Sequence, residues 1–147
     1  MSDKLVIGGS GFIGSHVSNH LAEKNQNVKV LNRGSRPEYL SPDIDYIESD
    51  VVNISSSDLE DVDTVFLQSG RTGIGDSLVE PDRYYQDNLR SVIPLLKMLD
   101  QSSVEHIVVA STIMVYGPGR YNCDRCGTVF PGKRSEDMLE KGHWEPV

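Results

Sequence analysis

The chain has 147 residues, of which 37% are hydrophobic and 24% charged, a balance that suits one globular domain with a core of ordinary size. The formal net charge of -8 leaves no basic face for nucleic acid or for an anionic membrane. The apolar runs, such as residues 107–110, are too short to span a bilayer. Because the first residues carry no secretory segment and the chain has only two cysteines, we expect a cytoplasmic protein.

Strands and helices alternate along most of the chain. The predicted strands are Lys4–Gly8, Val28–Asn32, Ile44–Glu48, Asp63–Gln68 and His106–Ser111. A first amphipathic helix is predicted over Phe12–Lys24 and a second from Pro81 to about Asp100, which Pro94 should kink.

Several strands are apolar on both faces, which favours a parallel sheet covered by helices. We therefore expect an α/β fold with a doubly wound, Rossmann-like sheet of about five strands in the order 3-2-1-4-5. Residues 1–117 would form this cofactor-binding part. Residues 118–147 would form an irregular, cysteine-containing tail with a weak helical pattern at Ser135–Lys141.

A glycine cluster, Gly8-Gly9-Ser10-Gly11-Phe12-Ile13-Gly14, joins the first strand to the first helix. In this arrangement Gly8 permits a tight turn, Gly11 lets the backbone approach a pyrophosphate, and Gly14 allows close packing of helix and strand. The amides of Gly11, Phe12 and Ile13 would then point at the phosphates from the helix N-terminus. The context predicts a dinucleotide site, and the alternative is a glycine-rich turn without a ligand.

The end of the second strand should contact the adenosine ribose. An acidic residue there binds the 2′-hydroxyl of NAD, whereas an arginine accommodates the 2′-phosphate of NADP. The chain has Asn32, Arg33 and Arg36 at this point, which favours NADP, although Asn32 also suits the plain ribose of NAD and the arginines also suit a solvated loop. Asp50 and Val51, after the third strand, fit a contact to the adenine edge, with a surface aspartate as the alternative.

The run from Lys4 to Gly117 resembles the NAD-dependent epimerase/dehydratase family of extended short-chain dehydrogenases. The resemblance rests on the glycine cluster, Asp50-Val51, Gln68-Ser69-Gly70, Asn88 and the segment Ser111-Thr112-Ile113-Met114-Val115-Tyr116-Gly117. It implies nucleotide-sugar chemistry, with Gln68, Ser69, Gly70 and Asn88 at the NAD or NADP site. It also implies that Thr112 bonds the sugar oxygen that undergoes redox.

A narrower resemblance, to dTDP-L-rhamnose 4-epimerases, extends into the tail. It rests on Arg71–Gly75, on Tyr116–Gly127 and on Gly142–Pro146, and it implies a cysteine-bearing loop after the Val-Tyr-Gly signature. The sugar itself does not follow from this resemblance.

The catalytic pair of that family, the Tyr and Lys of a Tyr-x-x-x-Lys motif, is absent, because no tyrosine of this sequence is followed by Lys four positions later. A positioned acid or base typically contributes about 10²–10⁴-fold to a rate. We therefore expect the cofactor-binding N-terminal portion of a truncated epimerase, inactive alone, that takes a nucleotide sugar only if the missing half is supplied. The alternatives are a non-catalytic dinucleotide-binding or redox-sensing module, and a partner subunit of a split epimerase.

Two further features bear on partners. Cys123 and Cys126 have the spacing of half a structural zinc site, which normally needs four ligands. With His143 as the one other nearby candidate, free thiols are the expectation for a single chain, and a metal shared by two chains is a hypothesis. The helix at 81–101 carries Leu89, Val92, Leu96 and Leu99, and the resemblance implies that this helix pairs in a dimer, so we expect either a homo-oligomer or a marginally folded chain.

Overall fold

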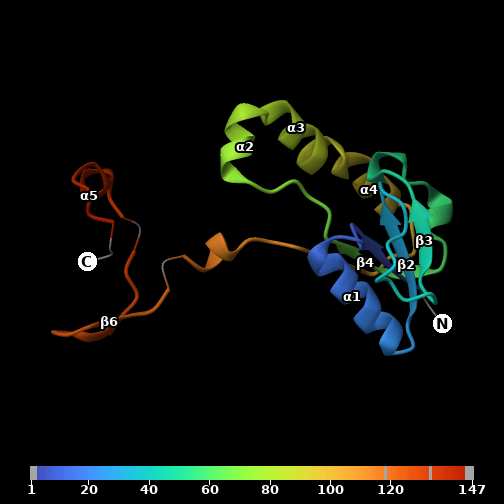
Figure 1. The fold of residues 1–147 in the computed structure, drawn as a ribbon, viewed down its shortest axis with the longest axis horizontal. Coiled ribbons are helices and arrows are strands. Elements are labelled where there is room, and N and C mark those ends of the chain that lie inside the picture. The colour runs from blue at the N-terminus through green and yellow to red at the C-terminus, as the bar shows by residue number, and fades with distance from the viewer. Residues whose placement is uncertain (1–2, 118, 133, 145–147) are drawn as a thin grey trace. The chain divides into compact units, whose positions relative to one another are not determined.

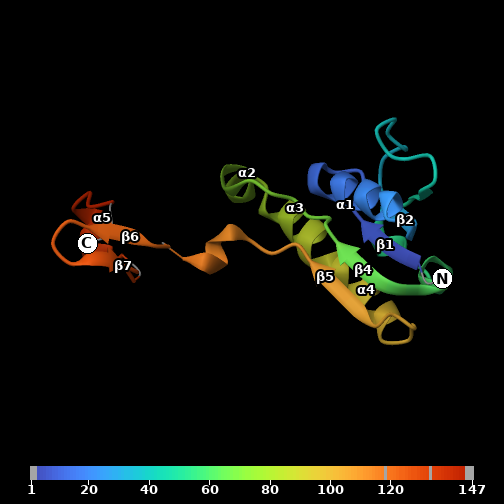
Figure 2. The ribbon, with the colours of Figure 1, turned by 90° about the horizontal axis from the view of Figure 1, so that it is seen from below.

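Five parallel strands form a central sheet. In this computed structural model they are β1 (Asp3–Ile7), β2 (Asn27–Asn32), β3 (Asp45–Glu48), β4 (Val62–Leu67) and β5 (His106–Val109). Their order in the sheet is β3-β2-β1-β4-β5, and each neighbouring pair is parallel (Figures 1 and 2). The predicted doubly wound sheet, with its strand order, is confirmed.

The structure describes residues 3–117, 119–132 and 134–144, and the chain divides into two compact units, Met1–Ala110 and Ser111–Val147. The first two residues, Pro118, and the Glu145-Pro146 pair of the narrower resemblance lie outside the described residues. The boundary expected after residue 117 stays a prediction. Within the described ranges, no helix is long and apolar enough to cross a membrane.

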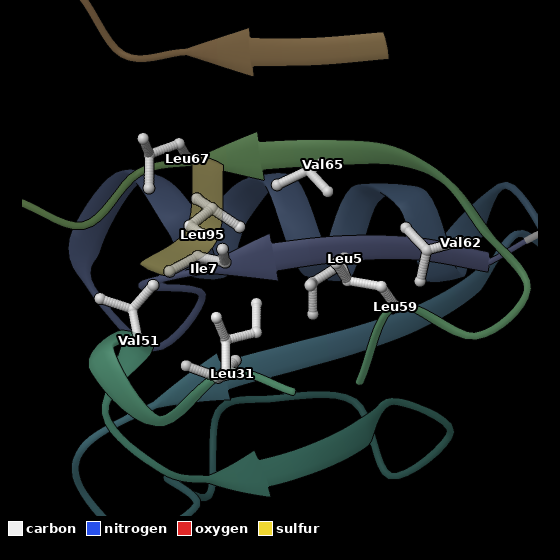
Figure 3. Packing of buried hydrophobic residues seen from close by; sticks show 10 residues of the cluster. Leu5, Ile7, Leu31, Val51, Leu59, Val62, Val65, Leu67 and Leu95 are labelled. Carbon is white, nitrogen blue, oxygen red and sulfur yellow. The ribbon is translucent and has the colours of Figure 1, made fainter. Parts of the chain in front are cut away.

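Helices cover both faces of the sheet (Figures 1 and 2). On one face, α1 (Phe12–Glu23) packs against Val6, Val28 and Val30. On the other, α4 (Val92–Leu99) contributes Leu95 to a cluster with Leu5 and Ile7 (Figure 3). Successive β1 side chains thus enter opposite layers, which explains why the strand is apolar at every position from Leu5 to Ile7.

The second long helix is not regular. It consists of α3 (Pro81–Tyr85), a π-helical turn η3 (Gln86–Arg90) and α4. The amide of Ser91 donates to the carbonyl of Gln86, five residues back, at 3.0 Å. Pro94 has no N–H and its ring crowds the carbonyl four residues earlier, so the kink expected from this proline is accommodated as a wider turn just before it.

Several short elements were not predicted. They are the 3-10 turns η1 (Val51–Asn53), η2 (Ser56–Leu59) and η4 (Ile113–Tyr116), the helix α2 (Ile74–Val79), and the antiparallel hairpin of β6 (Tyr121–Cys123) and β7 (Gly127–Val129). The helical pattern expected in the tail corresponds to α5 (Glu136–Glu140), whose Ser135 hydroxyl caps the amide of Met138 at 3.3 Å. Elements this short carry too few residues for a period to show in the sequence.

Candidate functional site

A cleft lies in the first unit at the carboxyl ends of β1, β2 and β4. The strand order reverses between β1 and β4, and in doubly wound sheets this is where ligands bind. The cleft is lined by Ile7, Gly8, Gly11, Leu31, Asn32, Arg33, Ser49, Asp50, Val51, Gln68, Ser69, Gly70, Asp87 and Ser91.

The glycine cluster forms a tight loop between β1 and α1. Gly8 has a φ of 80°, and a Cβ on it would lie 2.7 Å from the amide nitrogen of Ser69. A Cβ on Gly14 would lie only 2.2 Å from the carbonyl oxygen of Gly8. The first turn of α1 is therefore pressed onto the loop. Gly11 caps the helix without a side chain, which leaves the first-turn amides for an anionic ligand.

The two arginines after β2 have different surroundings. Arg33 lines the cleft, and its Nη1 lies 3.1 Å from Asp87 Oδ1 and 3.9 Å from Asp50 Oδ2. Arg36 is not among the lining residues. Its guanidinium donates to the carbonyl oxygens of Ile44, at 2.7 Å, and of Ser41, and so it holds its own loop together.

Asp87 is the residue that links the two sides of the cleft. Its carboxylate accepts from Arg71 Nε at 2.7 Å and from Arg33 Nη1 at 3.1 Å. Partial burial raises the pKa of Asp87, but the hydrogen bond from Arg71 and the charge of Arg33 outweigh it and hold the pKa below its ordinary value. The hydrogen bond to Asp87 likewise raises the pKa of Arg71. Asp87 therefore stays ionised and paired at neutral pH.

Asn88, the neighbour of Asp87, holds the loop that follows β4. Its Oδ1 accepts from the amide of Arg71 at 2.7 Å, and its Nδ2 donates to the carbonyl of Arg71 at 3.0 Å. The Tyr84 hydroxyl adds a bond to the carbonyl of Thr72 at 2.8 Å. The helix thus fixes the backbone immediately after Gln68, Ser69 and Gly70.

Of the residues proposed from the sequence, nine line the cleft together: Gly8, Gly11, Asn32, Arg33, Asp50, Val51, Gln68, Ser69 and Gly70. Phe12, Ile13 and Gly14 lie in the first turn of α1, and Asn88 acts through the adjoining loop. Asp87 and Ser91 were missed. Their spacing of four residues places them on the same side of a helix, and this was the available signal.

The remaining candidates belong to the second unit. Thr112 is exposed, and its carbonyl accepts from the amide of Val115 at 3.2 Å. Cys123 and Cys126 are free thiols. A hydrogen bond with the Cys126 thiol, together with the amides of Arg125 and Cys126, lowers the pKa of Cys123, while the same thiol–thiol bond raises the pKa of Cys126. In the part of the chain that the structure describes, no third His, Cys, Asp or Glu gathers with them.

A family model for the NAD dependent epimerase/dehydratase family matches residues 4–136. Among curated relatives, a dTDP-L-rhamnose 4-epimerase of Burkholderia thailandensis is 29% identical over 96% of this chain and 43% of its own length. A UDP-glucose 4-epimerase of Lactobacillus helveticus is 30% identical over 77% of this chain and 36% of its own length. The chain therefore spans less than half the length of these relatives.

Solved structures of nucleotide-sugar enzymes are also similar to this chain over part of their length. MoeE5 in complex with UDP-glucuronic acid and NAD has a TM-score of 0.72 and 31% identity, covering 80% of this chain and 39% of that one. A UDP-glucose 4-epimerase from Bifidobacterium longum, in complex with NAD+ and UDP, has a TM-score of 0.68 and 29% identity, covering 79% and 38%.

Proposed function

The chain belongs to the NAD-dependent epimerase/dehydratase family, and we propose that its cleft binds the dinucleotide cofactor as the N-terminal portion of a nucleotide-sugar epimerase or dehydratase. One observation carries the proposal. Gly14 lies so close to the Gly8 carbonyl that there is no room for a Cβ between them. This close packing sets the start of α1 directly against the ends of β1 and β4. A helix N-terminus in that position is an anion site, and a pyrophosphate is the anion that a doubly wound sheet receives there.

The lining residues then take separate roles. The amides of Gly11, Phe12 and Ile13 would hold the pyrophosphate, Asn32 and Arg33 the adenosine ribose, and Asp50 with Val51 the adenine. Gln68, Ser69 and Gly70, on a loop held by Asn88, would support the part of the cofactor beyond the pyrophosphate. The bound nicotinamide would supply hydride transfer, and Thr112 would hydrogen-bond the sugar oxygen at the reacting carbon.

This portion alone is proposed to bind the cofactor without turnover. The chain has no Tyr-x-x-x-Lys pair to move the proton, so a nucleotide sugar would react only when the remaining part of the enzyme is supplied. A free-standing dinucleotide-binding or redox-sensing module, or a partner subunit of a split epimerase, would also bind the cofactor. The two alternatives differ in one measurable property. A second chain would restore sugar binding to a subunit of a split epimerase, but not to a free-standing module. The expected cytoplasmic location belongs to the same proposal.

The identity of the cofactor depends on Arg33. The arginines in the sequence favour NADP, but the contacts of Arg33 in the structure weigh against this preference. Asp87 and Asp50 both lie within ion-pair distance of the guanidinium, so a 2′-phosphate would have to displace or face two carboxylates. We therefore propose that the chain favours NAD and that Asp87 sets this preference.

Isothermal titration of the purified chain tests both points. We expect NADH to bind more tightly than NADPH, and UDP-sugars not to bind. In Asp87→Asn, which releases Arg33 from its closest carboxylate, we expect the affinity for NADPH to rise about tenfold, since one charge-assisted hydrogen bond contributes about 1.5–3 kcal/mol. The affinity for NADH should change less than about threefold on the same scale.

Asp82→Asn is the matched control, because it makes the same change of charge at an exposed position on α3 that does not line the cleft. It should leave both affinities unchanged. Absence of binding by either dinucleotide would refute the proposed function. An equal response of both cofactors to Asp87→Asn would refute only the role of Asp87.

We also propose that the chain associates through the helix at 81–101, by a face that differs in part from the one expected. Val92 and Leu99 pack against the core, whereas Leu89, Ile93 and Leu96 are about half exposed or more. Light scattering should give a mass above that of one chain, and Leu89→Gln/Leu96→Gln should lower it. Leu78→Gln, on exposed α2, should not. A single-chain mass for the unmodified protein at high concentration would contradict association.

A further inference from the structure

The loop between β2 and β3 is fastened to α1. Leu40, within this loop, is buried in the layer that α1 covers. Asn19 of α1 bonds the backbone on both sides of Leu40. Its Nδ2 donates to the carbonyl of Tyr39 at 2.9 Å, and its Oδ1 accepts from the amide of Ser41 at 2.9 Å. Buried packing and two hydrogen bonds therefore set the position of Tyr39.

The side chain of Tyr39 reaches back to the glycine cluster. Its hydroxyl donates to the carbonyl oxygen of Ser10 at 2.6 Å. The same peptide unit carries the amide of Gly11, which donates to the carbonyl of Gly8 at 3.0 Å. Because a peptide unit is planar, these two bonds hold one rigid plane on both of its sides. That plane leads directly into Gly11, the N-cap of α1.

We propose that Tyr39 is a positioning residue for the pyrophosphate of the cofactor, acting through the peptide between Ser10 and Gly11. This role rests on the proposed function of the cleft. Gly11 has no side chain to cap α1, so the direction of the first-turn amides depends on how the loop before the helix is held. Tyr39 is not among the residues that line the cleft, so it would act on the ligand through this loop.

A loop that is held in advance should bind its ligand more tightly, because it loses less conformational entropy on binding. The bond to the Ser10 carbonyl also polarises the peptide unit and so strengthens the bond that Gly11 donates. Both effects concern the pyrophosphate, because the proposed contacts of the adenosine, such as Arg33 and Asp50, are not part of the glycine cluster. Loss of the Tyr39 hydroxyl should therefore affect one part of the cofactor and spare the other.

Titration calorimetry of Tyr39→Phe tests this role. Phenylalanine keeps the ring and removes only the hydroxyl of a side chain that is 61% exposed, so the free energy of unfolding in urea should stay nearly unchanged. We expect the dissociation constants for NADH and for ADP to rise about three- to tenfold, the range that corresponds to one neutral hydrogen bond. The affinity for adenosine, measured by competition against NADH, should change less than about twofold on the same scale.

Tyr46→Phe is the matched control. The Tyr46 hydroxyl donates to the carbonyl of Gly34 at 2.5 Å, so this variant removes the same kind of bond from the same loop without touching the glycine cluster. It should leave the affinities for NADH and ADP unchanged. Asn19→Ala should weaken binding of both ligands, but it should add no further loss in the Tyr39→Phe background, because Asn19 acts through Tyr39.

An unchanged affinity of Tyr39→Phe for ADP would overturn the role of Tyr39. An equal loss for adenosine, or an equal loss in Tyr46→Phe, would overturn it as well, since either result would show a general loosening of the loop. Full additivity of Asn19→Ala and Tyr39→Phe would overturn the path from α1 through Tyr39. Failure of the unmodified chain to bind either NADH or NADPH would instead overturn the proposed function of the cleft, and the role of Tyr39 with it.

Discussion

Replacing Gly14 with alanine is expected to weaken binding of the dinucleotide strongly. A Cβ at this position would lie 2.2 Å from the carbonyl oxygen of Gly8 and 2.9 Å from the Cα of Gly9, and both of these are backbone atoms that no side-chain rotation can move. Within a helix, alanine is otherwise favoured over glycine by about 0.8–1.0 kcal/mol. The outcome therefore depends on which of the two effects is larger.

Steric overlap should dominate. Added atoms in a well-packed region cost about 1–3 kcal/mol, and a contact this short with backbone forces α1 away from the loop after β1. The amides proposed to hold the pyrophosphate would move with the helix. We expect the dissociation constant for the cofactor to rise by about a hundredfold or more, equivalent to about 2.7 kcal/mol.

Gly75→Ala is the matched control. Gly75 lies in α2, and a Cβ there would meet nothing within 4 Å, so this change should raise the free energy of unfolding by at most about 1 kcal/mol and leave the affinity for the cofactor unchanged. Both variants can be compared by titration calorimetry and by urea unfolding. If Gly14→Ala bound the cofactor as tightly as the unmodified chain, the close packing of loop and helix could not be what positions the ligand.

Leu95→Ala is expected to cause the largest loss of stability. Leu95 is 1% exposed and is the buried residue of α4, where it reaches the cluster that contains Leu5 and Ile7 (Figure 3). Truncation of such a leucine costs about 2–5 kcal/mol through lost burial and a residual cavity. A domain has only about 5–15 kcal/mol in total, so this single change should remove a large fraction of it.

The effect should also reach the cleft. Pro94 precedes Leu95 and cannot donate a backbone hydrogen bond. Side-chain packing therefore contributes more to holding α4 in place than it would in a helix with all of its backbone hydrogen bonds. Asp87 and Ser91 lie on the turn just before α4 and line the cleft. We expect Leu95→Ala to lower the urea midpoint strongly and to weaken cofactor binding. Leu78→Ala, the same change at a side chain that is 81% exposed, should alter stability by less than about 0.5 kcal/mol. Equal effects of the two changes would refute the assignment of Leu95 as the anchor of the helix.

The sequence predicts two parts of the fold well: the strands and helices that show a hydrophobic pattern, and the residues that follow the carboxyl ends of the strands. The apolar run from Leu5 to Ile7 indicates an interior strand, and the glycines that follow it indicate a turn into a helix. Because parallel strands all end at one edge, residues as distant as Asn32 and Gln68 could be assigned to one site from the order of the strands alone.

What sequence could not supply is the direction of individual side chains. Arg33 and Arg36 looked equivalent, yet Arg33 lines the cleft while Arg36 bonds the carbonyls of its own loop. Asp87 was missed because a π-helical turn, which the sequence does not show, sets the rotation of the helix that carries it. The β6–β7 hairpin was missed because each strand has only three residues.

The central place of β1 in the sheet has a consequence for how the molecule acquires its shape. A short stretch of chain joins β1 to β2, so this pair is expected to form early, whereas Ile7 meets Leu67 only when a much longer loop has closed. Pairings so distant along the chain are slow, because loop-closure entropy is lost before the contacts form. The cleft forms only when β4 pairs with β1, which we expect to be the slowest long-range contact. The chain should therefore become able to bind a dinucleotide only when this pairing is complete. Fluorescence of NADH added during refolding should therefore rise with the late phase of folding rather than with the early formation of helices.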